Sequence, residues 1–386
     1  MVNISQKIID PPVNEEGVFP GQREAALLRA YGSQSLAFFG LSPENEHFLA
    51  VGGVGLVNYR LVNRVAVVLG DPICAPEAVE EVMRSFLAFC SQQRWRVALY
   101  QVRSDALESY RALKLHAFKM GEEALLSPQT FTLNGSALAN VRTSCRRAER
   151  DGVHIQWYEG VPPADVMQQL QQVSHAWLEN KGAEQGAETG FSTGRLDDLD
   201  MNAQLADRIA ASATSSTAAH SPVPRLVTAV AITSSGSACA FVTFTPIYGI
   251  PTEQSEGQGG GWSLDLMRRN PDAPPGVMDL LLARAIERFR ASGASVVSLG
   301  LAAWADSKGE ITSGQQQLAS FVTTRLGLFE SQRTLFSFKQ KFNPCWESRY
   351  LVTNTSLALP KIAFAVLQLR NYSRGRLTKF LGNMFK

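Results

Sequence analysis

The sequence lacks the residue spacings that bind structural metals or form disulfide frameworks. Its five cysteines are scattered, odd in number and contain no Cys-x-x-Cys, which argues against a structural zinc site and fits a reducing compartment. Its five histidines form no His-Glu-x-x-His pattern, the spacing by which a helix presents two zinc ligands. We therefore expect no catalytic metal.

Long apolar runs and a strong net charge are also missing. No run reaches the roughly 18 apolar residues that span a bilayer, and the start of the sequence has no apolar signal core. The formal net charge is only +2, so no global field indicates binding to DNA. We expect a cytoplasmic protein that can still lie on the inner face of the membrane.

The sequence has enough residues and apolar side chains for more than one core. With 386 residues, of which 45% are apolar, it has room for two to three domains of about 150 residues. Periodicity predicts the order strand–strand–helix–strand–helix–strand twice. The first copy is expected at 48–57, 65–69, 77–91, 97–102, 106–114 and up to 131. The second, which has one additional strand before its first helix, is expected at 226–232, 238–245, 262–267, 277–290, 295–299, 315–326 and 334–339. This repeated order predicts an α/β (α+β) fold with two similar domains, mixed central sheets and connecting helices.

The pattern divides the chain into four parts. We expect an N-terminal extension at 1–29, domains at 30–160 and 161–352, and a basic tail at 353–386. Helices at 138–150 and 163–180 connect the two copies. The low-complexity stretches 203–224 and 252–261 are expected to be disordered insertions. The second is glycine-rich but lacks the spacing of a phosphate-binding loop, which indicates a flexible hairpin tip.

Residues 262–279 place an acid and a base where a predicted strand meets a helix. Leu264 and Leu266 alternate with polar residues, prolines follow, and a helical apolar stripe begins after them. Asp265 and Arg268 therefore lie at the kind of sheet edge where open α/β folds bind ligands. Strict alternation would put them on opposite faces, so they need a bulge to act together. The structural alternative is an ion pair that pins the turn.

A second cluster of charges lies in 335–350. Alternation predicts that its two lysines share one face of a strand, where they would bind an anionic substrate group such as a phosphate. The alternative is an edge strand whose lysines prevent aggregation. The members of the cluster are Lys339, Lys341, Trp346, Glu347 and Arg349.

Two basic helical segments are candidates for contact with polyanions. In the first, Arg142, Arg146 and Arg150 share one helix face, with Arg147 beside them, as in helices that track phosphates. A solvated helix face is the alternative. In the second, residues 348–386 contain seven Lys and Arg and no acid, with an interrupted apolar stripe. This tail is either an amphipathic helix on anionic lipid or a helix that packs on the domain.

Several short motifs occur together in one order across residues 30–352. They are Phe38-Phe39-Gly40, Leu69-Gly70-Asp71-Pro72, Tyr100-Gln101-Val102, Lys119-Met120-Gly121-Glu122-Glu123-Ala124, Arg147-Ala148-Glu149-Arg150-Asp151-Gly152, Asp265-Leu266-Met267-Arg268, Pro271-Asp272-Ala273-Pro274, Gly276-Val277-Met278-Asp279, Lys339, Lys341-Phe342, Pro344, Trp346-Glu347 and Arg349-Tyr350-Leu351. In these motifs the chain resembles the C-terminal catalytic domain of the phosphatidylglycerol lysyltransferase family, also called multiple peptide resistance factor or DUF2156.

The resemblance implies a fold, an activity and a set of residues. The fold is two tandem acetyltransferase-like (GNAT) domains. The activity is transfer of an amino acid from aminoacyl-tRNA to a lipid hydroxyl, typically of phosphatidylglycerol, with no cofactor because the ester is already activated. Asp265, Arg268 and Glu347 match positions that the family uses for activity, and Lys339 and Lys341 lie in its matching segment. The partners implied are aminoacyl-tRNA, for which the arginines of 142–150 are the candidate contacts, and an anionic membrane lipid.

The sequence also departs from the family pattern. Arg146 stands where the family commonly has Asn, and the multi-helix membrane domain that usually precedes the catalytic domain is not in this sequence, so we expect the C-terminal helix to contact the membrane. The acceptor is then phosphatidylglycerol or another lipid alcohol such as a sterol. Two further alternatives are an acyl-CoA N-acyltransferase, disfavoured because Pro274 and Pro275 lack amide donors, and a non-catalytic adaptor for lipid or tRNA.

Overall fold

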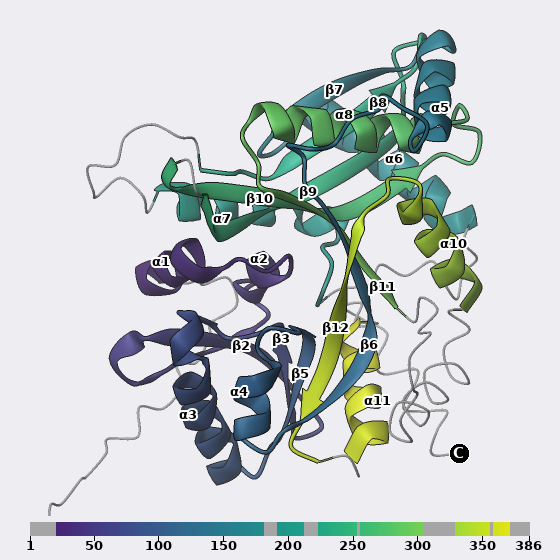
Figure 1. The fold of residues 1–386 in the computed structure, drawn as a ribbon. Helices are drawn as coiled ribbons and strands as arrows, with labels where there is room; N and C mark the ends of the chain where they lie inside the picture. Colours follow the sequence, from purple (N-terminus) through teal and green to yellow (C-terminus); the bar gives the residue numbers. More distant parts are fainter. Residues whose placement is uncertain are drawn as a thin grey trace, which may run out of the picture.

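A large mixed sheet runs through both halves of the chain (Figure 1). The structure, a computed structural model, describes residues 21–180, 191–211, 223–252, 255–303, 329–355 and 358–370. In spatial order the strands are β1 (Glu46–Leu49), β2 (Gly55–Val62), β3 (Val65–Leu69), β5 (Arg96–Arg103), β12 (Cys345–Thr353), β6 (His116–Leu126), β11 (Val296–Ala303), β10 (Ser255–Arg269), β9 (Ala238–Thr252), β8 (Val227–Ile232) and β7 (His154–Glu159). Strand β4 (Ile73–Cys74) pairs with β2 beside this path. The predicted mixed α/β class is confirmed.

The middle of the sheet exchanges strands between the halves. Strand β6, from the first half, pairs with β11 of the second half. Strand β12, near the end of the chain, pairs with both β5 and β6. Figure 1 shows β6 and β12 running side by side from one half into the other. Each half thus supplies a strand to the shared centre of one sheet. The division into two domains, at 30–160 and 161–352, remains a prediction.

Helices cover the sheet over three clusters of buried apolar side chains in the described residues. Helices α3 (Val79–Gln92) and α4 (Leu107–Ala112) pack on the first half. On the second half, α5 (Ala139–Arg150) and α8 (Val277–Ala291) share one cluster, while α6 (Ala164–Asn180) and α7 (Leu199–Ala211) belong to another. The remaining helices are α1 (Gln22–Tyr31), α2 (Ala37–Gly40), α10 (Phe329–Gln340) and α11 (Leu359–Arg370).

One predicted strand near the candidate site is wrong. Residues 334–339 lie in helix α10, so Lys339 and Lys341 do not share a strand face. The alternation of Phe336 and Phe338 resembles a strand, but burial follows the helical spacing. Lys339 and Phe342 are buried, and Phe336 stacks on Trp346 with ring centroids 4.6 Å apart. The helix expected at 315–326 lies outside the described residues.

Three other segments also differ from the sequence predictions. Residues 48–57 form two strands, β1 and β2, because Gly52 and Gly53 adopt positive φ between them. The stretch 203–224, expected to be disordered, begins inside α7, whose Ala203, Ala206 and Ile209 are buried at helical spacing. In the stretch 252–261, residues 255–261 belong to β10 and extend the hairpin with β9.

Helix α11 uses its apolar side in the core. Leu359, Ile362, Val366 and Leu369 are at most 8% exposed and belong to the cluster that covers β3. In its described part, the apolar stripe therefore packs on the protein, which was the second of the two alternatives. Residues 371–386 lie outside the described part. Among the helices that the structure describes, none has the length and apolarity needed to cross a bilayer.

Candidate active site

A gap in the sheet opens between strands β10 and β11. Their parallel pairing covers only Gly261 to Ser263 on β10 and Val296 to Ser298 on β11. Both strands continue beyond this point, β10 to Arg269 and β11 to Ala303. Backbone groups on the facing edges of such a gap are free to bind other groups. The two strands separate near the centre of an open sheet, and open α/β sheets bind ligands where neighbouring strands separate.

A β-bulge in β10 brings Asp265 and Arg268 to one face of the sheet. Leu264 is opposite Phe244 and Met267 is opposite Val242, so two residues of β10 face only Thr243 on β9. The amide of Leu266 donates to Thr243 Oγ1 at 3.0 Å. The bulge that cooperation between Asp265 and Arg268 requires is therefore present.

Asp265 is held by the loop that follows α6. Its Oδ1 accepts from the amide of Gly194 at 2.6 Å, and Thr243 Oγ1 lies 3.4 Å from its Oδ2. A Cβ at position 194 would lie 2.5 Å from Oδ2, so a larger residue there would require the Asp265 carboxylate to move. The neighbouring Arg195 fixes the loop through ion pairs to Glu44 at 2.6 Å and Asp198 at 2.7 Å.

The same loop carries a Gly-x-Ser-x-Gly spacing at 190–194. In hydrolases this spacing works as a nucleophile elbow between a strand and a helix. Here Ser192 is followed by a bend and the short 3-10 turn Leu196–Asp198, so the helix of an elbow is missing from this described part of the loop. The spacing does not indicate a hydrolase.

Arg268 is buried on the α6 side of the sheet. It is 4% exposed, it donates to Ser174 Oγ, and its guanidinium lies 5.4 Å from the centre of the Trp177 ring. A guanidinium over an aromatic ring gains cation–π attraction when it is shielded from water. These contacts fit a residue that fixes α6 against β10 next to Asp265.

Lys339 reaches the gap from the end of α10. Its Nζ donates to the carbonyl oxygens of Gly300, at 3.0 Å, and Leu301, at 2.9 Å, where β11 has left β10. The side chain is almost fully buried, and burial lowers the pKa of Lys339 to about 7, against the opposing field of Glu123. Two N–H bonds of the neutral amine satisfy the two carbonyls, which leaves its lone pair as a proton acceptor.

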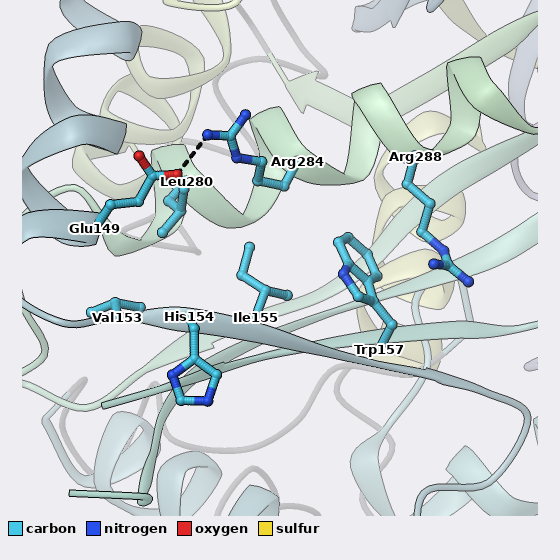
Figure 2. Close-up of a pocket in the computed structure, with 8 residues that line it drawn as sticks. All are labelled: Glu149, Val153, His154, Ile155, Trp157, Leu280, Arg284 and Arg288. Carbon is cyan, nitrogen blue, oxygen red and sulfur yellow. Dashed lines mark hydrogen bonds and ion pairs between the residues drawn. The ribbon is translucent and has the colours of Figure 1, made fainter. Parts of the chain in front are cut away.

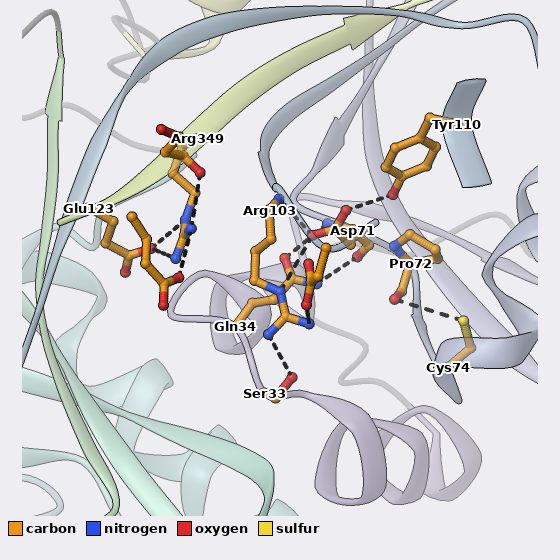
Figure 3. A network of polar contacts seen from close by, with 12 residues as sticks. Ser33, Gln34, Asp71, Pro72, Cys74, Arg103, Tyr110, Glu123 and Arg349 are labelled. Atoms are coloured by element: carbon orange, nitrogen blue, oxygen red, sulfur yellow. Dashed lines mark hydrogen bonds and ion pairs between the residues drawn. The ribbon is translucent and has the colours of Figure 1, made fainter. Parts of the chain in front are cut away.

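A buried ion pair supports the Lys339 site from strands β6 and β12. Arg349 Nε and Nη2 each lie 2.6 Å from Glu123 Oε2, and both side chains are at most 5% exposed (Figure 3). Glu123 also accepts from Ser298, whose Oγ accepts from the amide of Gly300 at 3.0 Å. The chain of contacts thus links Arg349 to the carbonyl that binds Lys339.

The other members of the 335–350 cluster take supporting positions. Glu347 pairs with Arg349 Nη1 at 3.1 Å and is 46% exposed. Trp346 donates from Nε1 to Gln340 Oε1 at 2.8 Å, which ties β12 to α10. Lys341 pairs with Asp279 at 3.4 Å, in the first turn of α8. Only Lys339 enters the gap among these residues.

In the first half, buried side chains occupy the corresponding position, at the end of β3. Asp71, after β3, accepts from Tyr110 Oη at 2.6 Å and from the Arg103 amide at 3.1 Å (Figure 3). Burial raises the pKa of Asp71 to about 6, although both hydrogen bonds oppose the rise. Gln34 also binds the backbone of Asp71 at 2.9 Å. The first half thus holds a buried acid at this position, and the second half holds the buried Lys339 amine, which is the candidate proton acceptor.

The arginines predicted for tRNA lie on α5 but differ in their contacts. Arg142 donates to the carbonyls of Leu133 and Gly135 and so fixes the preceding turn. Arg146, Arg147 and Arg150 are exposed. Across the residues with assigned positions, no group of three or more His, Cys, Asp or Glu is arranged to hold a metal ion.

Sequence reasoning missed Glu123, Ser298 and Gly194 as members of the site. Glu123 lies in a motif that carried the family resemblance, but its strand also contains Lys119 and Glu122, so charge alone did not distinguish it. Ser298 and Gly194 carry no such signal, because strand exchange and a long-range loop bring them into place.

Comparisons with known proteins concern the family and the fold of the chain. The family model "Phosphatidylglycerol lysyltransferase, C-terminal" matches residues 25–353. Phosphatidylglycerol lysyltransferase of Bacillus subtilis is 28% identical over 92% of this chain and 37% of its own length. The lysylphosphatidylglycerol biosynthesis bifunctional protein LysX of Mycobacterium ulcerans is 26% identical over 91% of this chain and 29% of its own. The chain thus spans about a third of these relatives.

Solved structures show the same fold. L-PGS from Bacillus licheniformis has a TM-score of 0.70 at 26% identity and covers 93% of this chain and 98% of its own. The C-terminal domain of a putative lysylphosphatidylglycerol synthetase from Agrobacterium fabrum has a TM-score of 0.72 at 24% identity, with 92% and 98% covered. FemX shares the fold at a TM-score of 0.54 and 8% identity, with 89% and 98% covered.

Proposed function

The chain belongs to the family of phosphatidylglycerol lysyltransferase C-terminal domains, and on this premise we propose that it transfers an aminoacyl group from tRNA to a lipid hydroxyl. Phosphatidylglycerol is the proposed acceptor, because the named relatives make its lysyl ester. The observation that carries the proposal is the Lys339 amine in the gap between β10 and β11, buried and bound by two carbonyls. The proposed location is the inner surface of the membrane.

The reaction exchanges one ester for another. The lipid hydroxyl oxygen attacks the ester carbonyl carbon of the aminoacyl-tRNA, and the neutral Lys339 amine accepts the hydroxyl proton. The bond from the carbonyl carbon to the ribose oxygen of the tRNA then breaks, and the Lys339 ammonium returns its proton to that oxygen. The products are an aminoacyl lipid and deacylated tRNA, and no other reactant is needed.

Asp265 and Arg268 are proposed to orient the substrates. Asp265 is held by Gly194 and Thr243 beside the gap, where its carboxylate can bind the acceptor hydroxyl or the amino group of the transferred residue. Arg268 keeps β10 against α6 and is a positioning residue. Glu347, already paired with Arg349, is proposed to bind the amino group at the exposed side. Lys341, Trp346 and Arg349 support this site.

The start of α8 argues against coenzyme A as the donor. Acetyltransferase-like folds bind a pyrophosphate through backbone amides at such a helix start. Here Pro274 and Pro275 have no N–H, and a Cβ on Gly276 would lie 2.3 Å from the carbonyl oxygen of Ser144 in α5. The helix start is therefore covered by protein, which favours a donor that is already an activated ester.

The Asp265→Asn variant tests the proposed site. We expect transfer to fall by about 10²-fold or more, because a neutral amide orients the acceptor hydroxyl or the ammonium of the transferred residue more weakly than a carboxylate does. The assay follows label from radiolabelled aminoacyl-tRNA into lipid, with separate vesicles of phosphatidylglycerol and of sterol to identify the acceptor. Asp272→Asn, in the exposed turn before α8, is the matched control. Equal transfer by Asp265→Asn and wild type would remove Asp265 from the mechanism.

Transfer should also depend on pH through Lys339. Because burial lowers the pKa of Lys339 to about 7, the neutral, proton-accepting form grows as pH rises. We expect the single-turnover rate to increase with a midpoint near pH 7 and then level off. Glu123→Gln removes a carboxylate that favours the ammonium form, so its midpoint should move to lower pH. A rate that does not change between pH 5.5 and 8.5 would contradict this role.

A further inference from the structure

A groove of about 450 Å³ runs along the outer edge of the second half (Figure 2). Edge strand β7 forms one side, and helices α5 and α8 form the other. Its apolar lining consists of Val153, Ile155 and Leu280, with Trp157 at one end. Figure 2 shows Ile155 and Trp157 pointing towards α8 while His154 points away from it. Ligand sites in proteins have this size, and four of the eight residues that line this groove are apolar.

The arginines inside the groove are paired with acids. Arg284 bridges Glu149 at 2.5 Å and Glu287 at 2.7 Å. Arg288 pairs with Glu159 at 2.8 Å, and its guanidinium lies 5.1 Å from the centre of the Trp157 ring. Both Arg288 and Glu159 are more than a third exposed, so this pair contributes little stability and can be exchanged for a ligand.

Helix α5, beside the groove, carries three exposed cations that are not part of the groove lining. Arg146, Arg147 and Arg150 lie on α5, the helix that supplies Glu149 to the groove, and all three are exposed. Within the described ranges, no carboxylate lies within ion-pair distance of any of them. The exposed surface of α5 thus carries positive charge that is unpaired among the described residues, while the neighbouring groove contains an aromatic ring.

The exposed arginines of α5 and the Trp157 ring together favour one class of ligand. Single-stranded nucleic acid binds where cations follow the phosphates and aromatic rings stack on the bases. A lipid bilayer is flat and requires a protruding apolar face, whereas this surface is concave. We propose that the groove binds single-stranded RNA at the acceptor end of the tRNA, with a base stacked on Trp157 and phosphates on the α5 arginines. This assignment rests on the proposed function and names the surface that receives its donor.

The position of β7 in the sheet sets the separation between the groove and Asp265. Trp157 pairs with Ala229 of β8, which pairs with Val242 of β9, which pairs with Met267 of β10. Trp157 therefore lies three strands from the bulge at Asp265, or about 14 Å at the usual strand spacing. An incoming base takes the place of the Arg288 guanidinium over the ring and leaves that guanidinium for a phosphate.

Equilibrium binding of deacylated tRNA, and of a seven-nucleotide RNA that ends in CCA, tests the groove with the full chain. Trp157→Ala should weaken binding by about 5- to 150-fold, the range for removal of one stacked base. Trp157→Phe keeps an aromatic ring and should stay within a few-fold of wild type. Arg146→Gln, Arg147→Gln and Arg150→Gln together should reduce the dependence of affinity on salt, by about 0.7 to 0.9 in the log–log slope for each phosphate that is no longer neutralised. The matched control is Arg111→Gln, an exposed arginine on α4.

The outcomes separate this proposal from the proposed function. If Trp157→Ala and the triple arginine variant bind both RNAs as wild type does, the groove is not the RNA site, even when wild type transfers label to lipid. Loss of binding to phosphatidylglycerol vesicles instead of RNA would also overturn it. If the variants lose RNA affinity but keep the wild-type rate at saturating tRNA, the groove is confirmed as a binding surface. RNA binding through the groove without transfer by wild type would contradict only the proposed function.

Discussion

Replacement of Lys339 by methionine is expected to lower aminoacyl transfer by about 10²- to 10⁴-fold, the usual contribution of a positioned proton acceptor. Methionine keeps much of the length and apolar stem of lysine but has no group that accepts the hydroxyl proton. It also leaves the carbonyls of Gly300 and Leu301 without their donor. The measurement is the single-turnover rate at saturating aminoacyl-tRNA and lipid.

Two controls separate catalysis from folding in this variant. Lys361→Met, on the exposed side of α11, removes a lysine elsewhere and should transfer at the wild-type rate. Affinity for deacylated tRNA should be the same in Lys339→Met and wild type, because Lys339 lies inside the sheet and not at the groove. A Lys339→Met rate within about two-fold of wild type would exclude Lys339 as the proton acceptor.

Replacement of Arg349 by methionine is expected to reduce the free energy of unfolding by about 3–5 kcal/mol, the usual cost of leaving one member of a buried ion pair alone. Glu123, on β6, would remain buried with Ser298 as its contact and without its ion-pair partner. Because Arg349 lies on β12, where the halves exchange strands, the loss should affect both halves. Urea denaturation followed by circular dichroism measures the change.

A double variant tests whether the effect belongs to the pair. Glu123→Gln combined with Arg349→Met removes both charges and should recover a large part of the lost stability, because no unpaired buried charge remains. The single variant Arg84→Met, on α3, breaks an exposed ion pair and should change stability by at most about 1 kcal/mol. If the double variant is as unstable as Arg349→Met, the loss comes from packing and not from the buried carboxylate.

The local elements of the fold were largely predictable from sequence. Apolar periodicity located α3, α5, α6 and α8 and most strands, because each of these elements buries one face along its length. The pairing of β12 with β5 and β6 was not predictable, since it joins residues more than 200 positions apart and leaves no local pattern. The exchange of strands between the two halves is therefore visible only in the structure.

The candidate site was predictable in part, and Lys339 shows why. Its place among the candidate residues followed from the charge cluster at 335–350 and from the family resemblance, but alternation placed it on a strand beside Lys341. In the structure α10 turns Lys339 into the sheet, while Lys341 stays half-exposed beside Asp279. The bulge at Asp265 was predictable, because strict alternation would have placed Asp265 and Arg268 on opposite faces of the strand. The sequence contained nothing that located Gly194 or the carbonyls of Gly300 and Leu301.

The most direct test of the account is the transfer of label by the wild-type chain. Purified protein is incubated with radiolabelled lysyl-tRNA and vesicles that contain phosphatidylglycerol, and the lipid phase is extracted and chromatographed. We expect label in a new, more cationic lipid, together with an equal amount of deacylated tRNA. If no lipid is labelled with lysyl-tRNA or with any other aminoacyl-tRNA, on phosphatidylglycerol or on sterol vesicles, the proposed activity is contradicted.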